Sequence, residues 1–477
     1  MDLSLVVWVI LPLNVIFAII IVFFERKDPT EAIAWLVLLF LLPPVGFVLY
    51  LLLGQNYTRQ KMFVVKEHDD RSFLREIFAE QQRRLTDRNH RFATLEAERF
   101  QKTISLLLQN NQAYLTEGNR VEIFTEGEDK FEALFRAIRE ARHHIHLEYF
   151  VINNDDLGRA VIHALAERAR QGVEVRLLID TMGSLRGGGL KVAFRELTDA
   201  GGKIGAFFPS IYRVNYRNHR KIAIIDGVAG FIGGFNIGDD YLGKGPLGYW
   251  RDTALQVVGP AAWALQLRFF LDWNYTTGEG LRLNSHYFPD TGTPGTTPIQ
   301  IVSSGPDTRW SPIKDGYINL INSARESVYI QTPYFIPDDS VTDALRIAAL
   351  SGVDVRIMIP CKPDHIFVYW ATLSFIGDLL EAGVRAYTYD AGFLHAKTIV
   401  VDREAGSVGS ANWDVRSFRL NFEANAFFYD AAVGAELAGA FEEDLSVCTE
   451  ITLENYRARP IEIRLKESIS RLFSPLA

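Results

Sequence analysis

The sequence predicts an α/β protein in which two similar α/β domains form a pseudo-twofold pair, preceded by two transmembrane helices. Three observations predict this class. A polar motif occurs twice, a strand–helix–strand pattern accompanies each copy, and two long apolar runs open the chain. The chain has 477 residues, of which 48% are hydrophobic, so it is long enough for several domains with a large core.

Residues 1–57 form the predicted membrane segment. Residues 3–24 and 32–53 are apolar runs without a charged residue, and each would be roughly 33 Å long as a helix, against about 30 Å for the hydrocarbon core. A cleaved signal peptide and a core hairpin are the alternatives. No basic stretch precedes the first run and no small-residue cleavage site follows it, which disfavours the signal peptide.

Basic residues near the apolar runs predict the orientation. Four follow the second run and two lie between the runs. They are Arg59, Lys61, Lys66 and Arg71 after the second run, and Arg26 and Lys27 between the runs. This count predicts that both ends of the chain, and the body that follows the runs, are cytoplasmic.

The rest of the chain divides by composition and periodicity. Residues 58–118 are charged with apolar residues at helical spacing, which predicts an amphipathic helical connector. Strand and helix patterns then alternate twice, which predicts one α/β domain over 119–288 and a second over 299–450. Residues 289–298, rich in Pro, Gly and Thr, are the joint, and residues 451–477 are a basic amphipathic tail.

The two motifs are NHRKIAIIDGVAGFIGGFN at 218–236 and LHAKTIVVDREAGSVGSAN at 394–412. Counted from each histidine, six polar or glycine positions match at offsets of 2, 7, 14, 15 and 17. The first set is His219, Lys221, Asp226, Gly233, Gly234 and Asn236; the second is His395, Lys397, Asp402, Gly409, Ser410 and Asn412. A single His-x-Lys would indicate a structural histidine, whereas two matching sets indicate a functional repeat.

Strand periodicity places each histidine and lysine on one face and the aspartate on the other. Asp226 and Asp402 therefore point away from their own histidines, and we expect them to brace the backbone of the motif. Asp252 and Glu423, which lie further along the chain, are better candidates to orient the imidazoles. The sequence does not say which acid serves which histidine.

A pseudo-twofold pairing would bring two histidines, two lysines and two asparagines to one cleft, which suits a phosphodiester. The lysines and amides would neutralise the non-bridging oxygens. One imidazole would attack phosphorus to form a phosphohistidine, and the other would exchange protons with the two alcohols. This chemistry requires no metal and no cofactor.

The paired HxKxxxxD motifs, each continuing into GGxN or GSxN, resemble those of the phospholipase D superfamily. Within it, the chain resembles bacterial cardiolipin synthases from end to end, in stretches such as YLGKGPLGYWRDTALQVVGPA and GSANWDVRSFRLNFEANAFFYD. The resemblance implies two phospholipase D-like domains in a bacterial inner-membrane protein that transfers a phosphatidyl group from one phosphatidylglycerol to another. It also favours His219 as the nucleophile, since the N-terminal histidine has this role in several relatives.

Other functions stay open at this point: a hydrolytic phospholipase D, a transferase for another alcohol, a nuclease, or an inactive membrane scaffold. The net charge of −8 argues against nucleic acid bound through bulk positive charge. GDDYLGKG at 238–245 lacks the Ser or Thr of a phosphate-binding loop, which argues against a nucleotide.

Three weaker sequence patterns can each be explained by a structural role. HHIH at 143–146 lacks companion metal ligands, so we expect a strand edge facing the cleft. His365 is either a substrate contact or an ordinary loop histidine. In the tail, Ile461, Leu465, Ile469, Leu472 and Phe473 share a helical face, which either docks on lipid or packs on the body.

Overall fold

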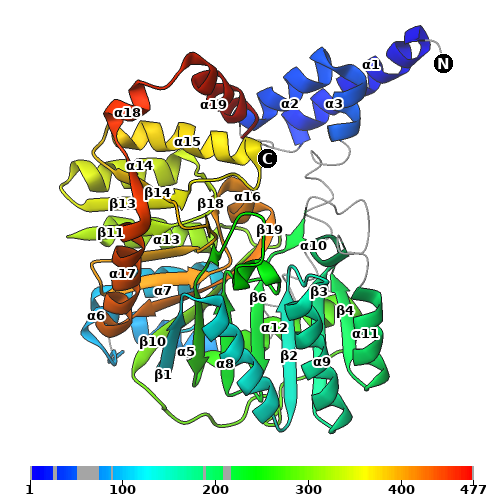
Figure 1. Cartoon of the computed structure of the whole chain (residues 1–477), viewed down its shortest axis with the longest axis vertical. Helices are drawn as coiled ribbons and strands as arrows, with labels where there is room; N and C mark the ends of the chain where they lie inside the picture. The colour runs from blue at the N-terminus through cyan, green and yellow to red at the C-terminus, as the bar shows by residue number, and fades with distance from the viewer. Residues whose placement is uncertain are drawn as a thin grey trace.

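The computed structural model describes residues 3–24, 29–50, 75–86, 90–185, 190–207 and 216–474. Within these residues a single 16-stranded mixed sheet runs through both halves of the protein (Figure 1). The two halves meet where β1 (Thr116–Phe124) pairs with β10 (Thr297–Ser304) in antiparallel register. The predicted pair of domains is therefore fused edge to edge into one sheet.

The first seven strands have the same order in both halves when they are read outward from the β1–β10 junction, and the second half has one more strand at its edge. In the first half β1 is followed by β9 (Ala254–Val258), β7 (Ala229–Gly233), β6 (Lys221–Ile225), β2 (His144–Tyr149), β3 (Glu174–Asp180) and β4 (Lys203–Phe207). In the second half β10 is followed by β19 (Asn421–Tyr429), β17 (Ala405–Gly409), β16 (Thr398–Val401), β11 (Ser327–Gln331), β13 (Asp354–Pro360), β14 (Arg385–Tyr389) and β20 (Cys448–Ile451). This order confirms the predicted pseudo-twofold relation.

Helices cover both faces of the sheet. α12 (Ala261–Thr277) and α17 (Ala431–Asp444) pack on one face in a core that both halves share, with Phe269 and Phe441 buried beside strand residues of either half. On the other face, the first half carries α8 (Gly127–Glu140), α9 (Asp156–Arg170) and α11 (Leu190–Asp199). The second half carries α13 (Pro312–Ser323), α14 (Asp339–Leu350) and α15 (Ile366–Leu380).

Part of the predicted connector belongs to this body. α5 (Arg75–Thr86) is followed by α6 (Leu95–Arg99) and α7 (Gln101–Asn111). Ile104 and Leu107 are fully buried in the core of the second half, and Gln300 donates to the backbone of Ile104 at 3.1 Å. The sequence pattern identified these helices but not their place, because an amphipathic face does not name the surface that covers it.

The N-terminal apolar runs are helical but interrupted. α1 (Leu3–Ile19) continues into the π-helical turn η1 (Ile20–Phe24). α2 (Pro29–Leu41) ends before α3 (Pro43–Leu49), because proline disfavours helical dihedrals in the residue before it. Among the described residues no helix is both long and apolar enough to cross a bilayer, so the two continuous spans expected from the sequence are not found there. The basic residues used to predict orientation lie outside the described residues.

The C-terminal tail folds as the short helix α18 (Leu453–Arg457) and the longer helix α19 (Ile461–Phe473). α19 packs along α15. In Figure 1 it lies at the same end of the molecule as α1–α3.

Candidate active site

Asp226 and Asp402 end the two motif strands and bind main-chain amides. The Asp226 carboxylate accepts hydrogen bonds from the backbone N–H groups of residues 142–144 at 2.8–2.9 Å. Asp402 accepts from the backbone N–H groups of residues 325–327 in the same way. Their φ angles are +54° and +52°, which aspartate tolerates in a hairpin turn. This is the bracing position that the strand periodicity predicts.

Two short parallel pairings tie each histidine to the opposite half of the protein. β5 (Arg217–Asn218) precedes His219 and pairs with β19, whereas β15 (Phe393–Leu394) precedes His395 and pairs with β8 (Trp250–Arg251). The backbone N–H of His219 donates to Phe422 O at 2.9 Å, and that of His395 donates to Arg251 O at 2.7 Å. The residue after each acceptor is an acid, so each acid is brought to the histidine of the other half.

A carboxylate contacts Nδ1 of each imidazole. Both oxygens of Glu423 lie 3.0 Å from His219 Nδ1, and Asp252 Oδ2 lies 2.6 Å from His395 Nδ1. Lys397 Nζ and the Tyr241 hydroxyl also approach His395 Nδ1, at 2.7 and 3.1 Å, but the carboxylate is the nearest group. We assign the Nδ1 proton to the bond with the carboxylate, which leaves the lone pair on Nε2.

Burial sets the charge of the two histidines. His219 and His395 are 8% and 6% exposed. Burial lowers the pKa of His219, although Glu423 opposes the shift. Burial, together with the charge of Lys397, lowers the pKa of His395 to about 3, against the opposing effect of Asp252. In this protein environment both imidazoles are neutral at pH 7.

The two motif lysines lie directly beside the histidines. Lys221 Nζ donates to the His219 carbonyl at 2.6 Å, and Lys397 Nζ donates to the His395 carbonyl. Burial lowers the pKa of Lys221 to about 7 and the pKa of Lys397 to about 8. An anion bound near these ammonium groups would stabilise their charged form.

The single difference between the motifs has a structural reason. A Cβ atom at Gly234 would lie 2.0 Å from Asp252 Oδ1, so glycine leaves room for the carboxylate that binds His395. In the other half, the Ser410 hydroxyl donates to Glu423 Oε2 at 2.5 Å. Each residue therefore serves the acid of its own half.

A cavity of about 540 Å³ lies over the histidines. His219, His395, Asn236 and Asn412 all line it, so the structure brings these predicted residues together. Its other described lining residues include Phe150, Arg217, Asp240, Tyr241, Trp250, Tyr334, Asp364, His365, Asp414 and Arg416. Lys221, Lys397, Asp252 and Glu423 are buried behind this lining, whereas Asp226 and Asp402 lie at the far ends of the motif strands.

Tyr241 was not selected from the sequence. It lies in the turn η4 (Asp239–Leu242), within the GDDYLGKG stretch at 238–245. Its hydroxyl accepts a hydrogen bond from Asn236 Nδ2 at 3.3 Å and contacts His395. The sequence signal that could have identified it is its position, five residues after the motif asparagine Asn236.

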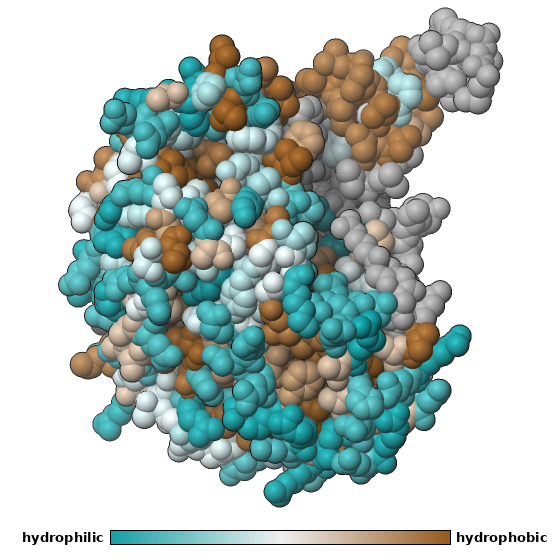
Figure 2. Space-filling model, in the orientation of Figure 1, coloured by the Kyte–Doolittle hydropathy of each residue, from teal (hydrophilic) through white to brown (hydrophobic). Residues whose placement is uncertain are grey.

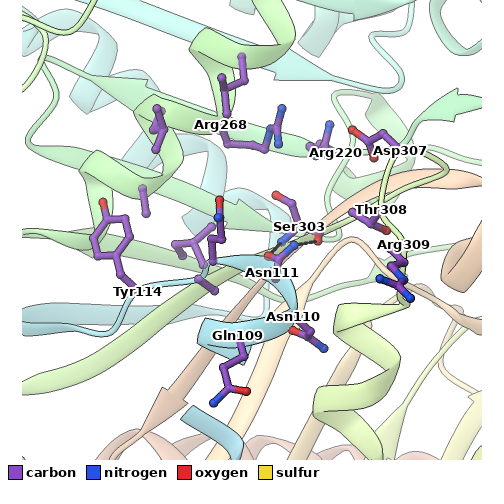
Figure 3. A pocket seen from close by; sticks show the side chains of 16 residues that line it. Gln109, Asn110, Asn111, Tyr114, Arg220, Arg268, Ser303, Asp307, Thr308 and Arg309 are labelled. Carbon is purple, nitrogen blue, oxygen red and sulfur yellow. Dashed lines mark hydrogen bonds between the residues drawn. The ribbon is translucent and has the colours of Figure 1, made fainter. Parts of the chain in front are cut away.

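A second cavity, of about 230 Å³, lies behind the first motif (Figure 3). Arg220, Arg268 and Asp307 face it. Arg220 Nη1 pairs with Asp272 at 2.6 Å, and Arg220 Nε donates to the Glu423 carbonyl at 3.2 Å. Arg220 therefore holds the backbone of the acid that binds His219, so this cluster supports the site from behind.

The histidines at 144 and 146 do not face the cleft, so that expectation is wrong. Both are fully buried against α12, where Gln266 bonds His144 at 3.1 Å and His146 at 2.8 Å. Burial lowers the pKa of both, so they are neutral core residues. In the described part of the chain no cluster of His, Cys, Asp and Glu has the arrangement of a metal site.

Comparisons with known proteins identify the family of the chain. The family model "Cardiolipin synthase, PLD-like domain" matches residues 134–244 and 317–445, one match in each half, and "Phospholipase_D-nuclease N-terminal" matches residues 13–55. A phosphatidylserine synthase structure from Haemophilus influenzae Rd KW20 is similar in fold, with a TM-score of 0.61 at 14% identity over 80% of this chain and 100% of that chain.

Full-length relatives are closer in sequence. The chain is 50% identical to the major cardiolipin synthase of Bacillus subtilis (strain 168) over 97% of both chains. It is 49% identical to the cardiolipin synthase of Staphylococcus aureus (strain Mu50 / ATCC 700699), over 97% of this chain and 95% of the relative. With both domains matched and these relatives aligned almost end to end, the chain belongs to the family of phospholipase D-like cardiolipin synthases.

Proposed function

We propose that the protein is a phosphatidyltransferase that makes cardiolipin and glycerol from two molecules of phosphatidylglycerol. The observation that carries the proposal is the cavity in which two histidines face one space, each bound by a carboxylate from the opposite half. Two such imidazoles at one phosphodiester provide a nucleophile and a proton donor without a metal.

In the first step, Nε2 of His219 attacks phosphorus and forms the N–P bond. The bond from phosphorus to the headgroup oxygen breaks, and protonated His395 gives its proton to the glycerol that leaves. The incoming phosphodiester carries a negative charge, which raises the pKa of His395 and so favours the protonated form this step needs. The two motif asparagines, which line the cavity, stabilise the non-bridging oxygens, and the charges of Lys221 and Lys397 add to this from behind the histidines.

In the second step, His395 takes the proton from a terminal hydroxyl of a second phosphatidylglycerol. That oxygen attacks phosphorus, the N–P bond to His219 breaks, and cardiolipin forms. One phosphodiester replaces another, so the exchange requires no nucleotide and no other source of bond energy.

The test is purified protein in detergent with phosphatidylglycerol labelled in its acyl chains and no nucleotide. We expect labelled cardiolipin and one free glycerol for each cardiolipin formed. Phosphatidic acid as the main product would identify a hydrolytic phospholipase D, and no turnover would identify a scaffold. Cardiolipin formed only when a CDP-activated lipid is added would refute the exchange mechanism.

The protein acts, in this proposal, at the bacterial inner membrane with its catalytic body on the cytoplasmic side. Its lipid substrates have their headgroups at the membrane surface, so the body must be held there. The apolar N-terminal helices and the excess of basic residues after them support this placement.

A further inference from the structure

Helix α19 has two faces with opposite surroundings. Glu467 and Ser470 are 3% and 4% exposed, and they face the body of the protein. Ile461, Leu465, Ile469 and Leu472 lie on the other side, within an arc of roughly 80° at 100° per residue. The sequence did not decide whether the apolar face of this helix packs on the body. In the structure the polar face of α19 packs on the body, and the apolar face points outward.

The exposure of this apolar stripe is large. The four side chains are 80%, 61%, 43% and 68% exposed, in chain order. Hydrophobic surface is visible at the end of the molecule where α19 and the N-terminal helices lie (Figure 2). A contiguous exposed apolar patch of this kind indicates a surface that meets another molecule or a membrane.

Exposed apolar side chains also lie next to residues that line the catalytic cavity. At the start of α15, Ile366 and Phe367 are 65% and 68% exposed, while their neighbours His365 and Val368 line the cavity. Ser474, directly after α19, lines the same cavity. The two helices therefore put exposed apolar side chains within a few residues of the cavity lining.

α19 is fixed in this position by specific contacts. Arg471 pairs with Asp378 of α15 at 2.7 Å, and its guanidinium lies 4.5 Å from the centre of the Phe375 ring. Arg471 also donates to the backbone carbonyl of Ser374, in α15, at 3.3 Å. These contacts hold the polar face of α19 on the body, so the outward stripe is preformed.

Positive charge accompanies the stripe. Arg464 and Lys466 are exposed on α19, against one exposed acid on the same helix, Glu462, while the charge of Arg471 is balanced by Asp378. Lysine and arginine beside an inserted apolar face add attraction to anionic lipid headgroups. The charge and the apolar stripe thus fit the same partner.

We propose that Ile366, Phe367, Ile461, Leu465, Ile469 and Leu472 form a lipid-docking rim that inserts into the surface of an anionic bilayer. The rim holds the cavity mouth against the headgroup layer, so that a phospholipid can present its phosphodiester without leaving the membrane. This contact is separate from the N-terminal apolar helices. Its detection does not depend on the proposed reaction, because insertion is measured directly.

Insertion is tested in the full-length protein with Cys361 and Cys448 replaced by serine. A single cysteine at residue 465 is labelled with an environment-sensitive fluorophore and mixed with phosphatidylglycerol vesicles that contain spin-labelled lipid. We expect a blue shift and strong quenching at this position. A matched label at Leu95, which is 80% exposed on α6 at the far side of the body, should show neither. Equal, weak signals at both positions overturn the proposal.

Activity gives a second, independent readout. The double variant Leu465→Glu/Leu472→Glu should lose about tenfold in turnover on bilayer substrate, but keep wild-type turnover on short-chain phosphatidylglycerol in detergent. The control Leu95→Glu/Leu283→Glu adds the same charge at exposed apolar positions outside the rim and should match wild type in both assays. If the rim variant loses activity equally in detergent, α19 supports the fold rather than docking. If wild type itself has no activity in detergent, the proposed reaction fails and the fluorescence result still decides the docking.

Discussion

At the scale of single residues, both imidazoles have a carboxylate at Nδ1 but differ in the other groups around them. His219 has Glu423 at Nδ1, whereas His395 has Asp252, Lys397 and the Tyr241 hydroxyl around the same atom. Asp252 favours a proton on His395, whereas the charge of Lys397 disfavours it. The geometry alone therefore does not choose the nucleophile, and the assignment of attack to His219 and of proton transfer to His395 is the one that the family resemblance favours.

A covalent trap tests this assignment. His395→Ala should still form the phosphohistidine from a substrate with a good leaving group, but should lack the base that activates the second alcohol. Acid-labile, base-stable label should therefore accumulate on residue 219, detected by peptide mapping. His219→Ala should accumulate none. Label on residue 395 in the His219 variant would reverse the roles, and label in neither variant would remove the covalent mechanism.

Each carboxylate binds the histidine of the opposite half, and this arrangement allows a more specific version of the trapping experiment. In the His395→Ala background, Glu423→Gln should slow label formation by roughly 10²-fold or more, because the amide no longer fixes the Nδ1–H tautomer of His219. Asp252→Asn is the matched control, since Asp252 serves the histidine already removed. Equal effects of the two substitutions would contradict the crossed pairing.

The low pKa values of the motif lysines predict that kcat/KM loses their contribution at an unusually low pH for lysine. Their pKa values, about 7 for Lys221 and about 8 for Lys397, lie well below 10.5 because both are buried. As the pH rises through this range the ammonium groups lose their charge, so the fall of kcat/KM with rising pH should become steeper above about pH 7–8. The pH profile of kcat/KM for short-chain phosphatidylglycerol in detergent measures this.

A substitution identifies the groups responsible. Lys397→Arg keeps its charge at every pH in the profile. If Lys397 contributes to the alkaline limb, this variant should shift the limb upward, whatever its absolute rate. An alkaline limb unchanged in the variant and placed near pH 10 in wild type would exclude the lysines.

At the scale of elements, the motif hairpins depend on their aspartates for stability. Asp226 accepts three backbone N–H groups from the turn before β2. Asp226→Asn places an N–H group against one of these donors, and should lower the free energy of unfolding by about 1–3 kcal/mol. Urea or thermal unfolding in detergent measures this loss.

Activity per folded molecule is the accompanying readout. Since Asp226 is remote from the cavity, the Asp226→Asn variant should keep most of its turnover at low temperature. Asn236→Ala, in the cavity lining, is the contrasting variant and should lose turnover with little loss of stability. If the Asp226→Asn variant is fully stable but has no turnover, Asp226 has a direct catalytic role.

At the scale of the whole molecule, orientation in the membrane is the open prediction. With both chain ends and the body in the cytoplasm, a reporter that is active only in the periplasm should stay silent when fused after Ala477. A reporter active only in the cytoplasm, fused at the same position, is the matched control and should be bright. The opposite pair of signals would invert the proposed topology.

Much of the site could be predicted because the motif occurs twice, and positions that match in both copies rarely do so by chance. Matching offsets selected the histidines, lysines and asparagines, and strand periodicity turned Asp226 and Asp402 away from the cavity. The partner of each acid could not be predicted, because it depends on β5 and β8 crossing to the other half. The burial of α7 and of His144 depended likewise on contacts distant in sequence, which local periodicity does not encode.

The β1–β10 junction has a consequence for how such a site can change over time. Two separate subunits around a twofold axis would be copies of one gene, so every substitution would appear on both sides of the cavity at once. Here the two sides lie on one strand-paired chain and are encoded separately. Gly234 could become the space for one acid while Ser410 became the hydroxyl for the other, and Tyr241 could arise beside one imidazole alone. A fused pair can thus specialise one half for donor chemistry and the other for acceptor chemistry while the shared cavity keeps working.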